Sequence, residues 1–249
     1  MQRILTTLAA LAVLLPCTCG VLEAAEKSQI KALLITGDDV KVHDWREMAA
    51  ATREVLEASG RFDIRTVEDT SILESELELA AYDVIVFLIY TRSNPEISDQ
   101  AKENLLNFVK GGKGFYSQHL ASASFSKWEE FGKLCGRYWV LGKSGHGPRS
   151  VFKSDIADDS HPITKGLKAF DVDDELYAKL QGDGEIEVLV TADSDWSDAT
   201  EPLVLTSQYG KGRSVHNAYG HDRKAIMTPE VQKLIARGVE WAATGAVAE

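Results

Sequence analysis

Cysteine is scarce in this chain, with three among 249 residues. Cys17 and Cys19 lie in an N-terminal segment that we expect to be removed, so the mature chain would keep Cys135 alone. A lone cysteine forms no internal disulfide, and stability must therefore come from the apolar core. Cys135 is expected at the end of a helix and not on a strand-to-helix turn, which argues against a cysteine nucleophile.

The sequence also lacks an apolar run long enough to span a bilayer. Ile4 to Leu15 is apolar, but a transmembrane helix needs roughly 20 such residues. Arg3 precedes this run, Pro16 ends it, and small residues follow as far as Ala25, a pattern typical of a secretory signal peptide. We therefore expect residues 1–25 to be a signal peptide and the protein to be secreted or periplasmic, without a membrane span after cleavage. A buried N-terminal helix is the alternative.

Positive charge is in the minority, with 27 Lys and Arg against 38 Asp and Glu, for a formal net charge of -11. An acidic surface repels phosphate backbones, so no nucleic-acid partner is expected. A small neutral ligand such as a sugar is compatible with this charge, and the oligomeric state is left open.

Several common catalytic motifs are absent from the sequence. It contains no phosphate-loop lysine motif, no Gly-x-Gly-x-x-Gly after the first expected strand and no Gly-x-Ser-x-Gly elbow. It also contains no His-x-x-x-His zinc spacing, so any metal site would have to be assembled from distant segments.

Segments with strand and helix periodicity alternate through the first half of the chain. Strands are expected over residues 30–37, 62–67, 82–89 and 114–117, and helices over residues 45–59 and 98–110. This order predicts an α/β fold with a doubly wound, mostly parallel sheet and right-handed crossovers. Such sheets bind ligands in the crevice beyond the carboxyl ends of their strands.

The second half is richer in strands and ends in a helix. Strands are expected over residues 150–156, 186–191, 202–208 and 213–219, and an amphipathic helix over residues 229–243. Tyr209-Gly210-Lys211-Gly212 joins the last two strands and predicts a C-terminal β-hairpin. Since no linker interrupts the pattern, residues 26–249 are expected to form one domain.

Histidines provide the main evidence for a functional site. His43, His119 and His221 each follow an expected strand, so their rings would converge on one crevice if the strands end at the same edge. Imidazole supplies metal ligation and general acid or base catalysis near neutral pH. His146 is expected in a flexible glycine-rich loop, where surface exposure and a role in the site are both open. The two remaining histidines, His161 and His216, are expected to be structural.

Carboxylates are concentrated in Asp173-Asp174-Glu175, which Leu176 and Tyr177 follow. Paired carboxylates suit metal binding or glycoside cleavage. A solvated turn before a strand is the alternative interpretation of this segment.

With these segments identified, the chain resembles the trehalose-utilisation (ThuA-like) family over nearly the whole mature sequence. The matching segments are Thr36-Gly37, His43-Asp44-Trp45, Tyr82 to Val86, Phe108 to Gly114, Gln118 to Phe125 with Trp128, His146-Gly147-Pro148, His161 to Leu167, Asp174 to Tyr177, Tyr209 to Arg213 and Gly220-His221-Asp222. Each segment alone is modest evidence, whereas the ordered set is specific.

The resemblance implies a flavodoxin-like three-layer sandwich similar to class I glutamine amidotransferases. In those enzymes the strand placed at residues 115–117 leads to a cysteine nucleophile, whereas Gln118-His119-Leu120 stands there in this chain. Amidotransferase chemistry is therefore not expected. The family is associated with sugar catabolism, including 3-keto-disaccharides and glycosides. Many relatives carry an asparagine after the matching histidine, where this chain reads Ala121-Ser122-Ala123-Ser124.

The leading hypothesis is an enzyme (a hydrolase, lyase or isomerase) acting on a small carbohydrate, with a divalent metal ion as the candidate cofactor. The expected catalytic residues are His43, His119, His221 and Glu175, the expected substrate-binding residues are His146, Asp44, Asp174, Tyr177 and Asp222, and the candidate metal ligands are His43, His119, His146 and His221.

Two alternatives stay open. A non-catalytic carbohydrate-binding or accessory protein would present stacking surfaces, for which the candidates are Trp128, Tyr138, Trp139 and Tyr177. A metal-dependent hydrolase of another substrate class would use the same histidines.

Overall fold

One mixed sheet organises the chain, and its strands come from both halves of the sequence. The computed structural model describes residues 29–38, 40–91 and 96–248. The expected signal peptide lies outside these residues. The sheet has nine strands in the order β2-β1-β3-β4-β11-β10-β9-β6-β7. Their bounds are β1 Ile30–Ile35, β2 Phe62–Val67, β3 Val84–Phe87, β4 Gly114–Gln118, β6 Ser150–Ile156, β7 Phe170–Asp174, β9 Glu187–Ser194, β10 Ala199–Tyr209 and β11 Gly212–Asn217.

Parallel and antiparallel pairing divide this sheet in two. All neighbours from β2 to β11 pair in parallel, whereas those from β11 to β7 pair antiparallel. The parallel half is the doubly wound sheet expected from the sequence. The expected hairpin is confirmed as β10 and β11, whose turn contains Gly210 at φ 63°. A separate two-stranded sheet joins β5 (Gly145–His146) to β8 (Tyr177–Ala178).

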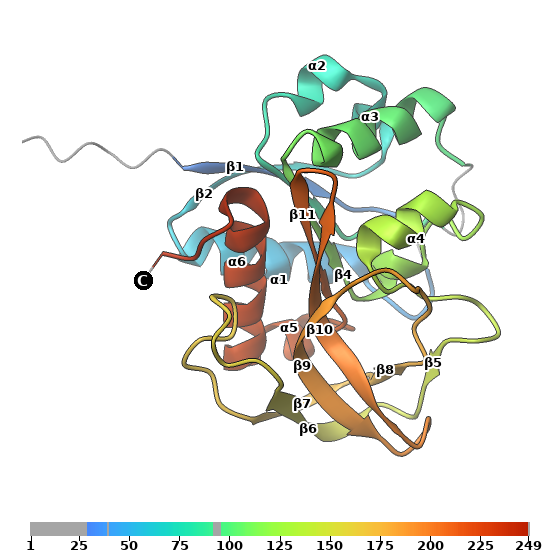
Figure 1. Ribbon diagram of the computed structural model, residues 1–249, viewed down its shortest axis with the longest axis vertical. Helices are drawn as coiled ribbons and strands as arrows, with labels where there is room; N and C mark the ends of the chain where they lie inside the picture. Colours follow the sequence, from blue (N-terminus) through green and yellow to red (C-terminus); the bar gives the residue numbers. More distant parts are fainter. Residues whose placement is uncertain (1–28, 39, 92–95, 249) are drawn as a thin grey trace, which may run out of the picture.

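Helices cover both faces of the sheet and complete the three-layer sandwich. The helices are α1 Trp45–Ala58, α2 Glu76–Leu79, α3 Asp99–Lys110, α4 Glu129–Cys135, α5 Arg223–Ile226 and α6 Pro229–Thr244, with 3-10 helices at η1 Ser71–Glu74 and η2 His119–Ala123. Figure 1 shows α1 and α6 on one side of β1, and α2 and α3 on the other.

Two apolar cores result from this layering. Val55 of α1 and Leu234 of α6 pack in one core, and Leu105 of α3 and Phe131 of α4 pack in the other. All four residues of β3 are buried, as its unbroken apolar sequence predicts for a strand covered on both faces. The apolar pattern of this strand therefore predicts its central position.

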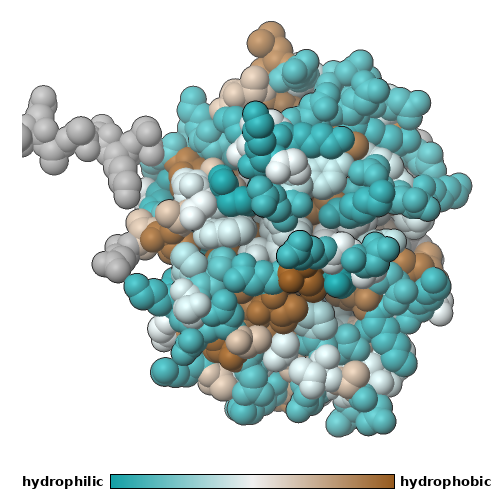
Figure 2. Space-filling model, viewed as in Figure 1, coloured by the Kyte–Doolittle hydropathy of each residue, from teal (hydrophilic) through white to brown (hydrophobic). Residues whose placement is uncertain are grey.

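The outside of the molecule is largely polar. Figure 2 shows hydrophilic side chains over most of the face in view, with a smaller apolar area near its centre. No helix in the described part of the chain combines the length and apolarity that crossing a bilayer requires.

Candidate metal and active site

Three loops that follow the parallel strands bring histidines to one edge of the sheet. β4 and β11 are parallel neighbours, and His119 follows β4 directly while His221 lies four residues beyond Asn217. His43 lies between β1 and α1. Since these strands end at the same edge, their loops meet there, which confirms the convergence expected from the sequence.

Ligand atoms of four residues come together at this edge. One nitrogen each of His43, His119 and His221 and one carboxylate oxygen of Glu175 all lie within 4.8 Å of one another. His43 Nε2 lies 3.1 Å from His119 Nε2 and 3.2 Å from His221 Nδ1. We refer to these four residues as the His3Glu cluster.

Glu175 completes the cluster with a carboxylate oxygen. Its Oε2 is 3.2 Å from His221 Nδ1, 3.5 Å from His119 Nε2 and 4.0 Å from His43 Nε2. The donors of a tetrahedral zinc site are about 3.3 Å apart, because each is about 2.0–2.1 Å from the ion. The spacing of the His3Glu cluster therefore suits a small divalent cation.

Backbone carbonyls determine which nitrogen of two rings faces the site. His119 Nδ1 donates to Ala218 O at 2.6 Å, and His146 Nδ1 donates to Gly147 O at 2.6 Å, because a carbonyl can only accept. A neutral ring with its proton on Nδ1 presents the lone pair of Nε2. His119 therefore presents a lone pair to the cluster, and His146 presents one to Glu175 Oε2 at 3.5 Å.

The turn after β4 has a restricted backbone. His119 adopts φ 49°, a left-handed conformation that residues other than glycine take at a cost of roughly 1–2 kcal/mol. Gly220, at φ 119°, approaches this turn so closely that an added Cβ would lie 2.7 Å from Gln118 Nε2. The close approach keeps the His221 loop beside His119.

Burial and mutual contact shift the ionisation of the cluster. Burial, followed by the neighbouring imidazoles, lowers the pKa of His43 to about 3. Burial alone would raise the pKa of Glu175, but the neighbouring His119 and His221 outweigh it and hold this pKa well below its usual range. The hydrogen bond to Glu175 raises the pKa of His221. The cluster thus combines an ionised carboxylate with at least one neutral imidazole at neutral pH.

Asp174 has a different role from the substrate binding predicted for it. Its carboxylate is fully buried, so a substrate cannot reach it. It accepts hydrogen bonds from the backbone N–H groups of Gly220 (2.7 Å), His221 (3.1 Å) and Glu175 (2.8 Å). Asp174 therefore fixes two members of the cluster relative to each other.

Asp44 and Asp222 likewise act as helix caps. Asp44 Oδ1 accepts from the N–H groups at the start of α1, and Asp222 Oδ1 accepts from Ala225 N of α5 at 2.9 Å. Asp222 also pairs with Arg149, whose Nε donates to Asp173 Oδ1 at 2.9 Å. These contacts give both carboxylates a capping role, and direct substrate binding by Asp44 and Asp222 stays a prediction.

Arg149 is a site-supporting residue that sequence reasoning missed. It bridges the end of β7 to the residue that follows His221, although it precedes these segments by more than twenty residues. Nothing in the local sequence marks Arg149 as a site residue, except that it directly follows the His146-Gly147-Pro148 segment.

A cavity of about 830 Å³ opens beside the His3Glu cluster, and we refer to it as the proximal cavity. It is lined by Val40, Lys41, Val42, His43, Tyr90, Leu120, Ala123, Trp139, Leu141, His146, Glu175 and Tyr177. His146 reaches it from β5 and not from the flexible loop that was predicted, because Gly145–His146 pairs with β8.

Tyr177 lies between two imidazoles in the wall of this cavity. Its ring stacks on His119 at 4.2 Å and on His146 at 5.9 Å between centroids, and Trp139 meets it edge-on at 4.7 Å. Tyr177 is 1% exposed among these rings, so it offers little surface on which a ligand could stack.

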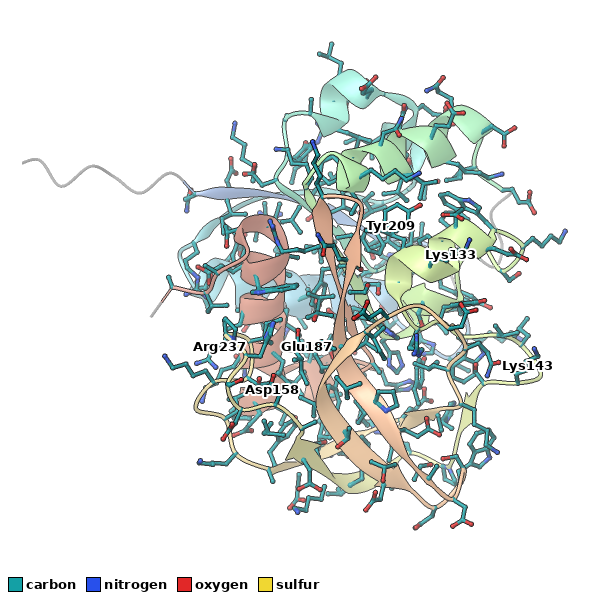
Figure 3. The ribbon with its side chains drawn as sticks, in the orientation of Figure 1. Lys133, Lys143, Asp158, Glu187, Tyr209 and Arg237 are labelled. Atoms are coloured by element: carbon teal, nitrogen blue, oxygen red, sulfur yellow. The ribbon has the colours of Figure 1, made fainter. Side chains whose placement is uncertain are left out.

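The other candidates lie away from the cluster. His161 packs near Trp241, and its ring accepts a hydrogen bond from Ile163 N. Arg237 of α6 donates a hydrogen bond to Ile163 O in the same loop. Figure 3 shows Arg237 near the segment that contains Asp158. His216 is buried on β11. Both positions are consistent with the structural roles predicted for these two histidines.

Cys135 and Tyr138 are also outside the cavity. Cys135 is fully buried at the end of α4, and burial raises the pKa of its thiol to about 12. Tyr138 packs against Gly132. These positions agree with the expectation that Cys135 is not a nucleophile, and they remove Tyr138 from the candidate stacking surfaces.

Comparison with known proteins agrees with this architecture. The family model described as "Trehalose utilisation" (ThuA) matches residues 31–242. A ThuA-like protein from Parabacteroides merdae is 31% identical with a TM-score of 0.77, covering 89% of this chain and 92% of that one. A ThuA-like protein from Bacteroides uniformis is 17% identical with a TM-score of 0.69, covering 89% and 96%.

More distant likeness concerns the fold alone. A GMP synthase component from Thermoplasma acidophilum is 12% identical with a TM-score of 0.54, covering 88% of this chain and 96% of that one. None of the curated proteins matches the chain. The family model covers most of the sequence, and the chain therefore belongs to the ThuA (trehalose utilisation) family.

Proposed function

We propose that the protein is an enzyme that holds a divalent cation in its His3Glu cluster and acts on a small carbohydrate in the proximal cavity. The observation that carries the proposal is the convergence of three imidazole nitrogens and one carboxylate oxygen within 4.8 Å. Three nitrogen donors and one oxygen donor favour zinc over magnesium or calcium, which prefer all-oxygen sites.

The arrangement of the ring nitrogens favours a bound cation over a cluster held together by hydrogen bonds alone. His119 has its proton on Nδ1, so its Nε2 is an acceptor that faces His43 Nε2. His43 Nε2 also lies 3.2 Å from His221 Nδ1, and one nitrogen can share only one proton with its two neighbours. A cation between the rings would instead use the lone pairs of all three nitrogens.

The residues around the cluster suit proton transfer at a polarised sugar oxygen or its neighbouring carbon. A bound divalent cation would act as a Lewis acid on a keto or glycosidic oxygen. His146 is the most exposed of the imidazoles around Glu175, with 31% of its side chain accessible, and its Nε2 lone pair faces the cluster. This position suits His146 to accept or return a proton at a substrate bound there.

The family description supports a carbohydrate as the substrate class, and the acidic chain favours a neutral ligand over a phosphorylated one. A hydrolase, a lyase and an isomerase would all use the same arrangement. A non-catalytic sugar-binding protein is the alternative, for which Trp139 in the proximal cavity is a stacking candidate, whereas Tyr177 is 1% exposed and offers no stacking surface.

A paired substitution tests the proposed function. His119→Ala should lose bound metal and turnover of 3-keto-glycosides, whereas His161→Asn, which changes a histidine outside the cluster, should keep both. Metal content by mass spectrometry and product formation by chromatography are the measurements. Unchanged metal content and turnover in His119→Ala would overturn the proposal, and a wider panel of ester and amide substrates would identify a hydrolase of another class.

We also propose that the protein is exported. The motivation is the short apolar run between Arg3 and Pro16, followed by small residues. Expression in a bacterial host and mass determination of the product should find a chain beginning between Gly20 and Glu26. Recovery of the uncut chain in the cytoplasm would contradict this.

A further inference from the structure

His146, the proposed proton-transfer residue, lies on a segment that has little support of its own. β5 consists of Gly145 and His146 and forms a two-stranded sheet with β8, through two residue pairs. Gly145 and Gly147 on either side of His146 give this segment more conformational freedom than other residue types would. Two short strands without further packing are only marginally stable in water. The position of His146 therefore depends on what packs behind β5.

Trp196 packs behind this segment from the turn between β9 and β10. A Cβ added at Gly145 would lie 2.4 Å from Cη2 of Trp196, and a Cβ added at Gly147 would lie 3.3 Å from Cβ of Trp196. The indole therefore lies along the backbone from Gly147 to Gly145. Because side chains alternate between the two sides of an extended segment, Trp196 is on the opposite side of the segment from the His146 ring.

The turn that carries Trp196 is itself held in place. Ser194 Oγ accepts a hydrogen bond from Ser197 N at 3.2 Å, and Ser194 O accepts one from Asp198 N at 2.9 Å. Lys179 Nζ lies 4.9 Å from the centroid of the Trp196 ring, within the range of a cation–π interaction. Since Lys179 directly follows β8, Trp196 is linked to both strands of the small sheet.

We infer that Trp196 is a positioning residue, which holds His146 in its place beside Glu175. The inference rests on the proposed function, in which Nε2 of His146 presents its lone pair 3.5 Å from Glu175 Oε2. Trp196 does not line the proximal cavity, so it acts through His146 and not by contact with a substrate. Without the indole, the Gly-His-Gly segment would lose its support and the imidazole would leave the geometry that proton transfer needs.

Turnover of 3-keto-glycosides by the zinc-loaded full chain tests this role. Trp196→Ala should lower kcat about 10–100-fold with KM nearly unchanged, because a displaced catalytic group costs rate and not substrate binding. His146→Ala should lower kcat about 100-fold or more. The variant with both substitutions should be no slower than His146→Ala, since Trp196 acts through the imidazole. A residue that merely supports the fold would lower kcat by the same factor in either background.

Gly145→Ala tests the same contact from the other side. The three atoms nearest to an added Cβ all belong to the indole, and the backbone at Gly145 is not left-handed. Gly145→Ala should therefore lower kcat in the unaltered protein and have little effect in Trp196→Ala, where the space is free. Leu77→Ala is the control, because it removes an 86% exposed apolar side chain of α2, which Figure 1 shows well apart from β5. The control should keep the unaltered turnover.

Hydrogen exchange provides a measurement that does not depend on activity. In the metal-free protein, Trp196→Ala should speed amide exchange several-fold in peptides that cover residues 144–147, because local opening of β5 becomes easier. Exchange in peptides that cover α6 should stay unchanged. Faster exchange in both segments would show a loss of global stability and would overturn the local role of Trp196.

The outcomes distinguish the role of Trp196 from the proposed function. Unchanged kcat and exchange in Trp196→Ala, together with a loss of turnover in His146→Ala, would overturn the role of Trp196 and leave the proposed function in place. A further loss of kcat when Trp196→Ala is added to His146→Ala would also overturn it. If the unaltered protein turns over none of these glycosides, the proposed function fails, and the catalytic role of Trp196 fails with it.

Discussion

His119 and His43 bring their Nε2 atoms to 3.1 Å from each other although 76 residues separate them in the chain. Their rings are tilted by 54°, and a third ring, that of His221, meets His43 at 65°. Such angles also occur between packed aromatic rings. The approach of the ring nitrogens to 3.1 and 3.2 Å is what distinguishes a ligand cluster from an aromatic packing contact.

Asp174 is expected to control metal affinity without touching the metal. Asp174→Asn replaces one acceptor oxygen by an NH2 group, which cannot accept from the backbone N–H groups that hold Glu175 and His221. Loss of such support behind metal ligands typically weakens binding about 10–100-fold. Competition with a chromophoric zinc chelator measures the change.

Asp155→Asn provides the control for that experiment, because Asp155 is an exposed carboxylate on β6 that pairs with Lys153. The Asp155→Asn variant should bind zinc with the same affinity as the unaltered protein. Equal affinities for the two variants would show that Asp174 does not position the cluster.

Arg149 is expected to support the same cluster from the other side. Arg149→Met removes the link between Asp173 and Asp222, so the loop that carries His221 loses one of its attachments. We expect about a tenfold loss of zinc affinity, with most of the metal-free fold retained. Arg65→Met removes an exposed arginine that pairs with Glu78 and should leave zinc affinity unchanged. A loss of thermal stability in Arg149→Met with unaltered zinc affinity would assign Arg149 to the fold alone.

His216 is expected to make the protein acid-sensitive. Burial, with a smaller effect of His119, lowers the pKa of His216 to about 3, and neither ring nitrogen has a hydrogen-bond partner within the described ranges. Between pH 6.5 and 3 the unfolded chain binds this proton and the folded protein does not, so stability falls as the pH falls through that range. The slope from one such group is about 1.4 kcal/mol per pH unit.

His216→Leu should remove both effects. Replacing an unpartnered buried imidazole by an apolar side chain should raise the free energy of unfolding by about 1–2 kcal/mol at pH 7. The gain should grow as the pH is lowered to 5, as measured by urea unfolding of the metal-free protein at each pH. An identical pH slope for the variant and the unaltered protein would contradict the account of His216.

Much of the fold could be predicted from the sequence because its signals are local. The unbroken apolar run at Val84 to Phe87 predicts a covered strand, and Gly210 and Gly212 predict the hairpin turn. The histidines after strand ends were predictive for a related reason: parallel strands run in the same direction, so their carboxyl ends lie at one edge of the sheet.

The carboxylates of the site could not be assigned from sequence in the same way. Asp174 and Glu175 are adjacent and chemically similar, yet one is fully buried behind the cluster and the other faces it. What separates them is the alternation of side chains along β7, whose register depends on antiparallel pairing with β6 about twenty residues earlier. The pairing of Gly145–His146 with β8 is non-local too, so a glycine-rich segment that predicts a loop forms a strand.

X-ray absorption at the zinc edge of the zinc-loaded protein tests the central claim most directly. We expect one zinc per chain, with three histidine nitrogens at about 2.0–2.1 Å and a carboxylate oxygen at about 2.0–2.2 Å, and a loss of one histidine contribution in His119→Ala. A chain that takes up no stoichiometric metal, or zinc coordination that is the same in His119→Ala, would contradict it.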